Sequence, residues 1–234
     1  MHKLLLILIV STLTLTASAQ HLTLSINGGA SIPTGSFAKG DYADPSSGFA
    51  GTGGHFNITG AWSLSKHWSI QALVGYSGLG SKGAQSLSDG YKEDSGTDST
   101  TLYRKGSNHV WSFLAGPRYS IDAGKKLTLS ARVLIGYVHT HLAGFQIFYE
   151  DYTDNAMTQQ EASGGAFGGQ AGLGLAYHLT KKLSIQINGD YVISKPNIPI
   201  HYEDFIVNSG RRLNTYNQSL AGVNATLGLA YTLF

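Results

Sequence analysis

Two histidines with the spacing of metal ligands, His139 and His141, flank a single threonine. On an extended strand both imidazoles would point to the same face. Glu150 or Asp151 could complete a metal site with them, because imidazole and carboxylate groups both bind zinc. His139 also continues the alternating row that contains Tyr137. Since that row explains the histidine without any ligand, we predict no metal site.

Catalytic residue types show no comparable grouping. Serine, histidine and acidic residues are present, but there is no His-x-Ser-Asn cluster or other hydrolase signature. The absence of cysteine removes a thiol nucleophile and thiolate metal ligands. The glycine-rich stretches "GFAGTGGH" and "GGAFGGQAGLG" are not followed by the helix or the lysine that a phosphate-binding loop needs. We therefore predict a protein that is not an enzyme and uses no cofactor.

Three charged residues, Arg118, Arg132 and Asp190, lie inside stretches that otherwise alternate between apolar and neutral residues. Their role depends on the elements that carry them. From Gln20 onward the apolar residues recur with a period of two, which is typical of strands with two different faces. We count one strand, three hairpins and a final strand, which makes eight strands.

The connections between these strands alternate between short and long. The short basic turns are predicted near residues 65–67, 122–126 and 180–182. The long polar segments are roughly residues 33–54, 79–108, 140–165 and 195–217. These long segments hold twelve of the fourteen acidic residues. Unstructured loops of such length are uncommon in compact soluble domains.

The composition fits residues that alternate between two environments. Charged residues make up 13% of the chain, and glycine accounts for 30 of its 234 residues. A typical soluble domain has roughly 25% charged residues and about 7% glycine. Mean hydropathy is near zero, at -0.05. The formal net charge of only +2, without a basic tract, excludes a nucleic-acid partner.

The N-terminus has the pattern of an export signal. Lys3 precedes an apolar run, and Ala17 and Ala19 form an A-x-A cleavage site. We predict that residues 1–19 are a cleaved signal peptide and that residues 20–234 form the β-barrel domain.

Short turns at one end of a sheet and long loops at the other are the plan of an outer-membrane barrel. The bilayer cannot hydrogen-bond an open sheet edge, so the sheet must close on itself. We predict an all-β protein, an eight-stranded antiparallel up-and-down transmembrane β-barrel with short periplasmic turns and four long extracellular loops. The alternative is a secreted lipocalin-like barrel with its apolar residues inside. It does not explain the asymmetry in loop length.

The repeated hairpins, "GPRYSI" at 116–121 and the C-terminal "LGLAYTLF" resemble the small outer-membrane β-barrel family of the OmpA/OmpX-like type, often called porin-family proteins. The resemblance implies a place in the cell outer membrane among lipid and lipopolysaccharide. It also implies that the barrel-assembly machinery reads the last strand. Tyr231 and Phe234 are three residues apart and would point to opposite faces, so this chain departs from the family's terminal aromatic pattern.

With the apolar rows facing lipid, Arg118, Arg132 and Asp190 face the lumen, where we expect the other residues to be mostly small or neutral. Eight strands leave an interior only just wide enough for side chains to fill. Because unpaired buried charge is costly, we predict a lumenal ion-pair network that plugs the barrel. The alternative is that the three charges are solvated separately in a narrow water-filled tube.

The sequence therefore predicts a structural and surface-interaction protein. Its extracellular loops combine acids, hydroxyls and aromatic residues, which suit a glycan or protein ligand. Two alternatives stay open, a small porin-like channel for solutes or ions and an outer-membrane lipid-modifying enzyme. A channel needs a continuous wet lumen, whereas an enzyme needs a serine, a histidine and an acid that converge.

Overall fold

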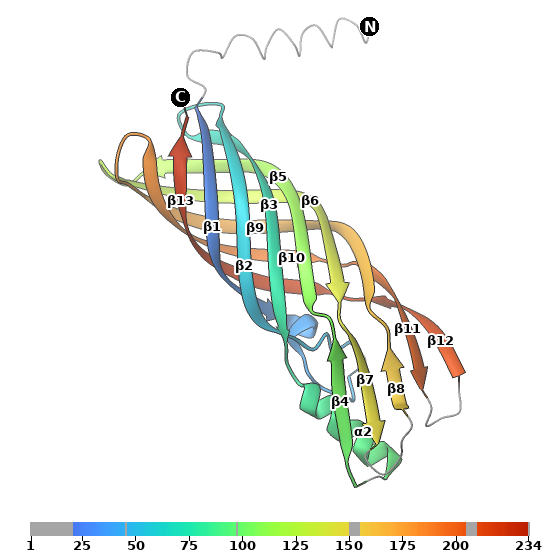
Figure 1. The fold of residues 1–234 in the computed structure, drawn as a ribbon. Helices are drawn as coiled ribbons and strands as arrows, with labels where there is room; N and C mark the ends of the chain where they lie inside the picture. The colour runs from blue at the N-terminus through green and yellow to red at the C-terminus, as the bar shows by residue number, and fades with distance from the viewer. Residues whose placement is uncertain (1–20, 45, 97, 150–154, 205–209, 234) are drawn as a thin grey trace, which may run out of the picture.

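The computed structural model contains a closed antiparallel barrel of eight strands, in which the first strand pairs with the last (Figure 1). The strands are β1 (Leu22–Thr34), β2 (Ala50–Ser63), β3 (Trp68–Ser81), β5 (Asn108–Asp122), β6 (Leu127–Leu142), β9 (Ala162–His178), β10 (Leu183–Ser194) and β13 (Leu220–Thr232). They follow one another around the barrel in chain order. The predicted fold class is confirmed.

The structure describes residues 21–44, 46–96, 98–149, 155–204 and 210–233. The predicted signal peptide at 1–19 and the terminal Phe234 lie outside these residues.

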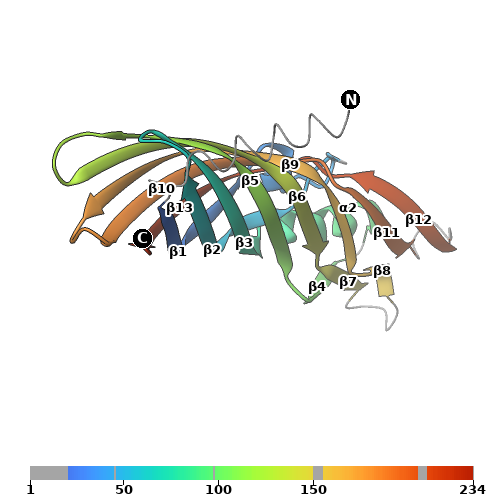
Figure 2. The same ribbon diagram turned by 90° about the horizontal axis from the view of Figure 1, so that it is seen from above.

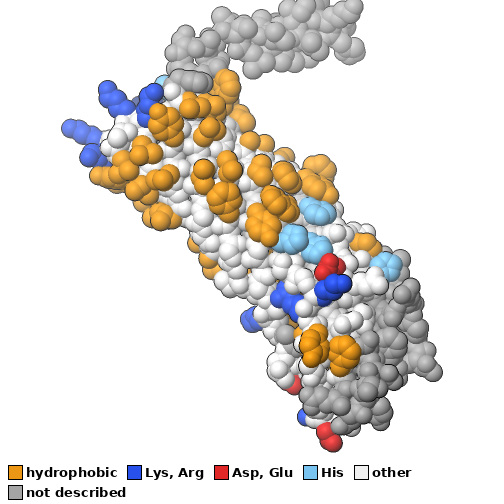
Figure 3. Space-filling model, viewed as in Figure 1, with side chains coloured by type: hydrophobic (Ala, Val, Ile, Leu, Met, Phe, Trp, Pro, Cys, Tyr) orange, Lys and Arg blue, Asp and Glu red, His pale blue; other side chains and the backbone are white. Residues whose placement is uncertain are grey.

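The apolar residues that recur with a period of two in the sequence lie on the outer face of the barrel wall, and the residues between them face the lumen. Ile26 is 56% exposed, whereas its neighbours Ser25 and Asn27 are buried in the lumen. Apolar side chains gather on the outer wall, and Lys and Arg gather at the end of the barrel that has the short turns (Figure 3). This apolar outer surface fits a lipid environment and contradicts the lipocalin-like alternative, which requires the opposite arrangement.

Aromatic pairs mark two heights on this wall. Trp68 and Tyr119 lie 5.0 Å apart between ring centroids, near the short turns. Tyr76 and Trp111 lie 4.9 Å apart toward the opposite end. Aromatic side chains at both heights are what the two membrane interfaces favour.

The long segments form a second, five-stranded sheet beyond the barrel rather than open loops (Figures 1 and 2). Its strands are, in sheet order, β12 (Gly210–Asn217), β11 (Asn197–Asp204), β8 (Asn155–Gln159), β7 (Gly144–Tyr149) and β4 (Thr100–Lys105). Helix α2 (Ala84–Ser95) packs on one face of this sheet, where Tyr91 contacts Ile147 and Met157. No helix in the described part of the chain is long and apolar enough to cross a membrane.

The first long segment links the two parts of the fold. Its short 3-10 helix η1 (Gly35–Ala38) inserts Phe37, which is 2% exposed, into the outer end of the barrel. Tyr42 then packs edge-on against Tyr91 of α2, with ring centroids 5.4 Å apart. In the same segment, Lys39 donates a hydrogen bond to Asp44, and this bond holds the pKa of the Asp44 carboxyl below its usual range.

The lumen has two unlike halves. Near the termini it is lined by hydroxyl, amide and charged side chains. Toward the outer sheet it is narrowed by a buried apolar cluster, beside which Ser31, Ser77 and Ser112 also face inward. The cluster includes Phe37, Leu73, Leu79, Val110, Leu114, Leu134, Val138, Val192 and Leu220. Small and neutral polar residues are buried in the lumen as expected, and the outer half adds large aliphatic side chains that this expectation did not include.

Candidate functional site

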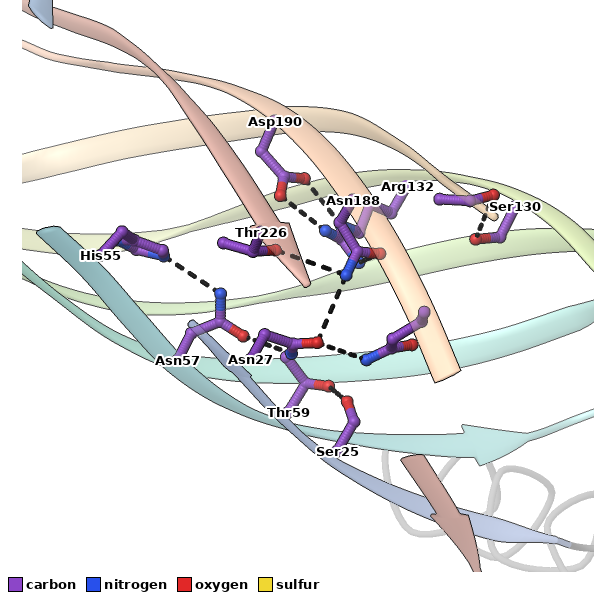
Figure 4. Close-up of polar contacts among 12 residues, drawn as sticks. Ser25, Asn27, His55, Asn57, Thr59, Ser130, Arg132, Asn188, Asp190 and Thr226 are labelled. Carbon is purple, nitrogen blue, oxygen red and sulfur yellow. Dashed lines mark hydrogen bonds and ion pairs between the residues drawn. The ribbon is translucent and has the colours of Figure 1, made fainter. Parts of the chain in front are cut away.

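The polar half of the lumen centres on an ion pair between Arg132 and Asp190 (Figure 4). The Arg132 Nε and Nη2 atoms donate to Asp190 Oδ1 and Oδ2 at 2.8 and 2.6 Å. The two side chains are only 4% and 1% exposed. A bidentate, charge-assisted arrangement of this kind is among the strongest side-chain interactions in proteins.

Glycines provide the space for contacts between strands that are not adjacent. Arg132 on β6 and Asp190 on β10 are both in register with Gly172 on the intervening β9. A methyl group at residue 172 would lie 1.9 Å from Asp190 Oδ1. In the same way, Gly228 on β13 is in register with both Asn27 and Gln186.

A chain of side-chain amides extends from this ion pair around the lumen. Arg132 Nη1 donates to Asn188 at 3.1 Å, and Asn188 donates to Asn27 at 3.4 Å. Asn27 Oδ1 also accepts a 2.6 Å bond from Gln186, and Asn27 Nδ2 donates to Asn57 at 2.7 Å. We call the connected set the lumenal network; its members are Arg132, Asp190, Asn188, Thr226, Gln186, Asn27, Asn57, His55 and Ser77.

The far end of the lumenal network contains a serine, a histidine and an asparagine. His55 Nδ1 lies 2.8 Å from Ser77 Oγ, and His55 Nε2 lies 3.1 Å from Asn57 Nδ2. Asn57 Oδ1 already accepts from Asn27, so its Nδ2 donates to His55. His55 Nε2 is therefore the acceptor and Nδ1 carries the proton that it donates to Ser77. A histidine in that tautomer cannot take the serine's proton, as a catalytic base must.

Arg118, the third predicted member of the charge network, does not join it. Its Cα pairs with that of Arg132 across β5 and β6, so both side chains face the same lumen. Arg118 Nε is nevertheless buried without a hydrogen-bond partner, and no ion pair links Arg118 to the described acidic residues. The structure thus brings Arg132 and Asp190 together and leaves Arg118 apart.

The sequence matches the model of one protein family, described as the outer membrane protein beta-barrel domain, over residues 4–232. The chain belongs to this family. Its location is the outer membrane, with the apolar barrel wall in lipid. No curated protein sequence matches the chain.

Solved structures with the family's barrel architecture resemble the chain in fold. Neisserial surface protein A is 9% identical, with a TM-score of 0.50, over 92% of this chain and 100% of that protein. A major outer membrane protein from Thermus thermophilus is 15% identical, with a TM-score of 0.50, over 91% of this chain and 99% of that protein. At these identities the likeness concerns the fold alone.

His139 and His141, the candidate metal ligands of the sequence, lie at the outer rim of the barrel wall. His141 stacks on His109 of the adjacent strand with ring centroids 4.6 Å apart, and its Nε2 lies 3.8 Å from a carboxylate oxygen of Glu161. His139 stacks on Tyr137 at 6.4 Å. Among the described residues no group of three or more His, Cys, Asp or Glu side chains could hold a metal ion. The other candidate ligands, residues 150 and 151, lie outside the described residues.

Proposed function

We propose that this barrel is a non-enzymatic surface-interaction protein that anchors its outer sheet for carbohydrate binding. The observation that carries the proposal is the sheet face opposite α2. Tyr103, Gln146 and Thr158 lie in register across β4, β7 and β8 on that face. The ring of Tyr103 is 60% exposed and meets Phe148 edge-on at 5.5 Å.

This open face has the chemistry of sugar recognition. Alternation along each strand turns Leu102, Ile147 and Met157 toward α2, so their neighbours face outward. An exposed aromatic ring can cover the apolar face of a sugar. The adjacent amide and hydroxyl groups can donate to and accept from its hydroxyl groups.

The apolar constriction of the lumen supports the role of an anchor over that of a channel. Phe37, Leu114 and Leu134 are each at most 3% exposed and belong to the apolar cluster that narrows the outer half of the lumen. An apolar constriction of this kind excludes water and with it hydrated ions. The lipid-modifying alternative is disfavoured because Ser77 Oγ accepts a hydrogen bond from His55 instead of donating one to a catalytic base, and because Ser77 is only 7% exposed.

We also propose two further partners for the barrel, the outer-membrane lipids and the barrel-assembly machinery. Outer-membrane lipid and lipopolysaccharide surround the exposed apolar wall, with the rim histidines at headgroup height. The barrel-assembly machinery reads the last strand, β13, on which Tyr231 points outward and is 46% exposed.

The test is a glycan array probed with the purified barrel in detergent. The wild type is expected to bind a subset of glycans, and Tyr103→Ala with Phe148→Ala is expected to weaken that binding at least tenfold. Asp98→Ala, an exposed residue between α2 and β4, serves as the control and should bind as the wild type does. Absence of glycan binding by the wild type, or equal binding by the double variant, would refute the proposal.

A further inference from the structure

Arg118 is a lumenal cation without a protein counter-charge among the described residues. It stands opposite Arg132, whose charge Asp190 already neutralises. Asp122 is the nearest acid along β5, but it lies four residues away, which is about 13 Å on an extended strand. A partly buried cation that faces a second cation requires a negative partner, because uncompensated charge is costly to bury.

Gln71 on the neighbouring strand β3 also lacks partners. Its side chain is 0% exposed, and neither Nε2 nor Oε1 has a hydrogen-bond partner in the described protein. Ser69 pairs with Arg118 and Gln71 with Gly116, so Arg118 and Gln71 are diagonal neighbours on the lumenal face. Gly116 has no side chain that could satisfy the amide. Buried amides are rarely left unsatisfied, so these atoms point to a bound group.

We propose that Arg118 and Gln71 bind a small protonated oxyanion of the phosphate class. The guanidinium donates to the anionic oxygens, and Gln71 Nε2 donates to one of them. Gln71 Oε1 accepts from the hydroxyl group of the oxyanion. Sulfate and chloride carry no proton to donate near neutral pH, so they would leave that oxygen unsatisfied.

The anion enters from the periplasmic end. Arg118 is four residues from the end of β5, and Gln71 is three residues from the start of β3, so both lie near the short turns. On the outer side the lumen is closed by Leu73, Leu114 and Leu134, which are 2%, 3% and 0% exposed.

The test follows the thermal unfolding midpoint of the full barrel in detergent by tryptophan fluorescence. Inorganic phosphate, or sulfate in a parallel series, replaces chloride at constant ionic strength. For the wild type we expect phosphate at a hundredfold excess over Kd to raise Tm by about 5–10 °C, and sulfate to raise it less. Arg118→Gln should remove the difference between the two anions. Arg104→Gln, on β4 outside the barrel, should retain it.

A second variant keeps the proposal testable if Arg118→Gln folds poorly. Gln71→Glu places a carboxylate beside Arg118, so its Tm in chloride should exceed that of the wild type and no longer respond to phosphate. An unchanged Tm of the wild type in phosphate would overturn the proposal, as would an equal response of the wild type and Arg118→Gln. Equal responses to phosphate and sulfate would overturn the assignment of a protonated oxyanion.

Discussion

Arg132 and Asp190 form a bidentate ion pair across an entire strand, because Gly172 of β9 leaves the space between them. The pair thereby connects β6 to β10 and fixes the register of three strands at once. A shift of β9 by one residue would place a neighbour of Gly172, Ala171 or Leu173, between the two charges. The interaction thus serves the specificity of the fold as well as its stability.

Removal of the carboxylate should destabilise the barrel strongly. Asp190→Asn keeps the shape of the side chain but leaves the Arg132 charge buried and unpaired, which costs about 3–5 kcal/mol. The free energy of unfolding in urea, followed by tryptophan fluorescence, measures this loss. Asp122→Asn, at the exposed end of β5, is the control and should change it by less than about 0.5 kcal/mol. An Asp190→Asn barrel as stable as the wild type would show that the ion pair is not needed.

Gly172→Ala should be costly for a steric reason alone. The added methyl group collides with Asp190 Oδ1, so either the ion pair or β9 must move, at about 1–3 kcal/mol or more. Gly189→Ala provides a matched control, since a methyl group there meets no atom within 4 Å. Urea unfolding of both variants separates the cost of the collision with Asp190 from the cost of replacing any strand glycine by alanine. Equal stabilities would contradict the role assigned to Gly172.

Ser77 should be chemically inert. His55 donates to its oxygen, so the serine is not deprotonated and is too buried for a substrate to reach. A fluorophosphonate probe should therefore label the wild type no more than Ser77→Ala. Stoichiometric labelling that Ser77→Ala abolishes would instead support the lipid-modifying alternative.

Tyr91→Ala should loosen the outer sheet and leave the barrel intact. Tyr91 joins α2 to Ile147 and Met157, and truncation of a buried aromatic residue costs about 3–5 kcal/mol. Limited proteolysis should then cut the extracellular segments faster, while the heat-dependent shift in gel mobility stays unchanged. Tyr103→Ala, on the open face, should leave proteolysis as in the wild type. Faster loss of the barrel itself in Tyr91→Ala would contradict the separation of the two parts.

The barrel could be predicted from the sequence because its signal is local. Alternation over ten or more residues assigns Ile26 to lipid and Asn27 to the lumen without any knowledge of pairing. The short basic turns then fix which strands are neighbours. The lumenal position and common height of Arg118 and Arg132 follow from the same reasoning, as does the turn between them.

The outer sheet could not be predicted in this way because its strands are short and pair across three different loops. Thr100–Lys105 has only six residues, and its partner β7 lies beyond two barrel strands. Helix α2 is polar and contains Gly90, which lowers helix propensity but allows Tyr42 to pack directly against it. The failure of Arg118 to reach Asp190 is likewise a matter of side-chain geometry, which alternation does not encode.

The role that we propose for the barrel is that of a closed anchor for an extracellular binding sheet. Single-channel recording of the folded wild-type barrel in a planar bilayer tests it most directly. We expect no conductance steps over many insertions, because Phe37, Leu114 and Leu134 belong to an apolar cluster that constricts the lumen. Stable openings whose size changes on substitution of Arg118 or Asp190 would contradict the anchor role and make the protein a narrow channel.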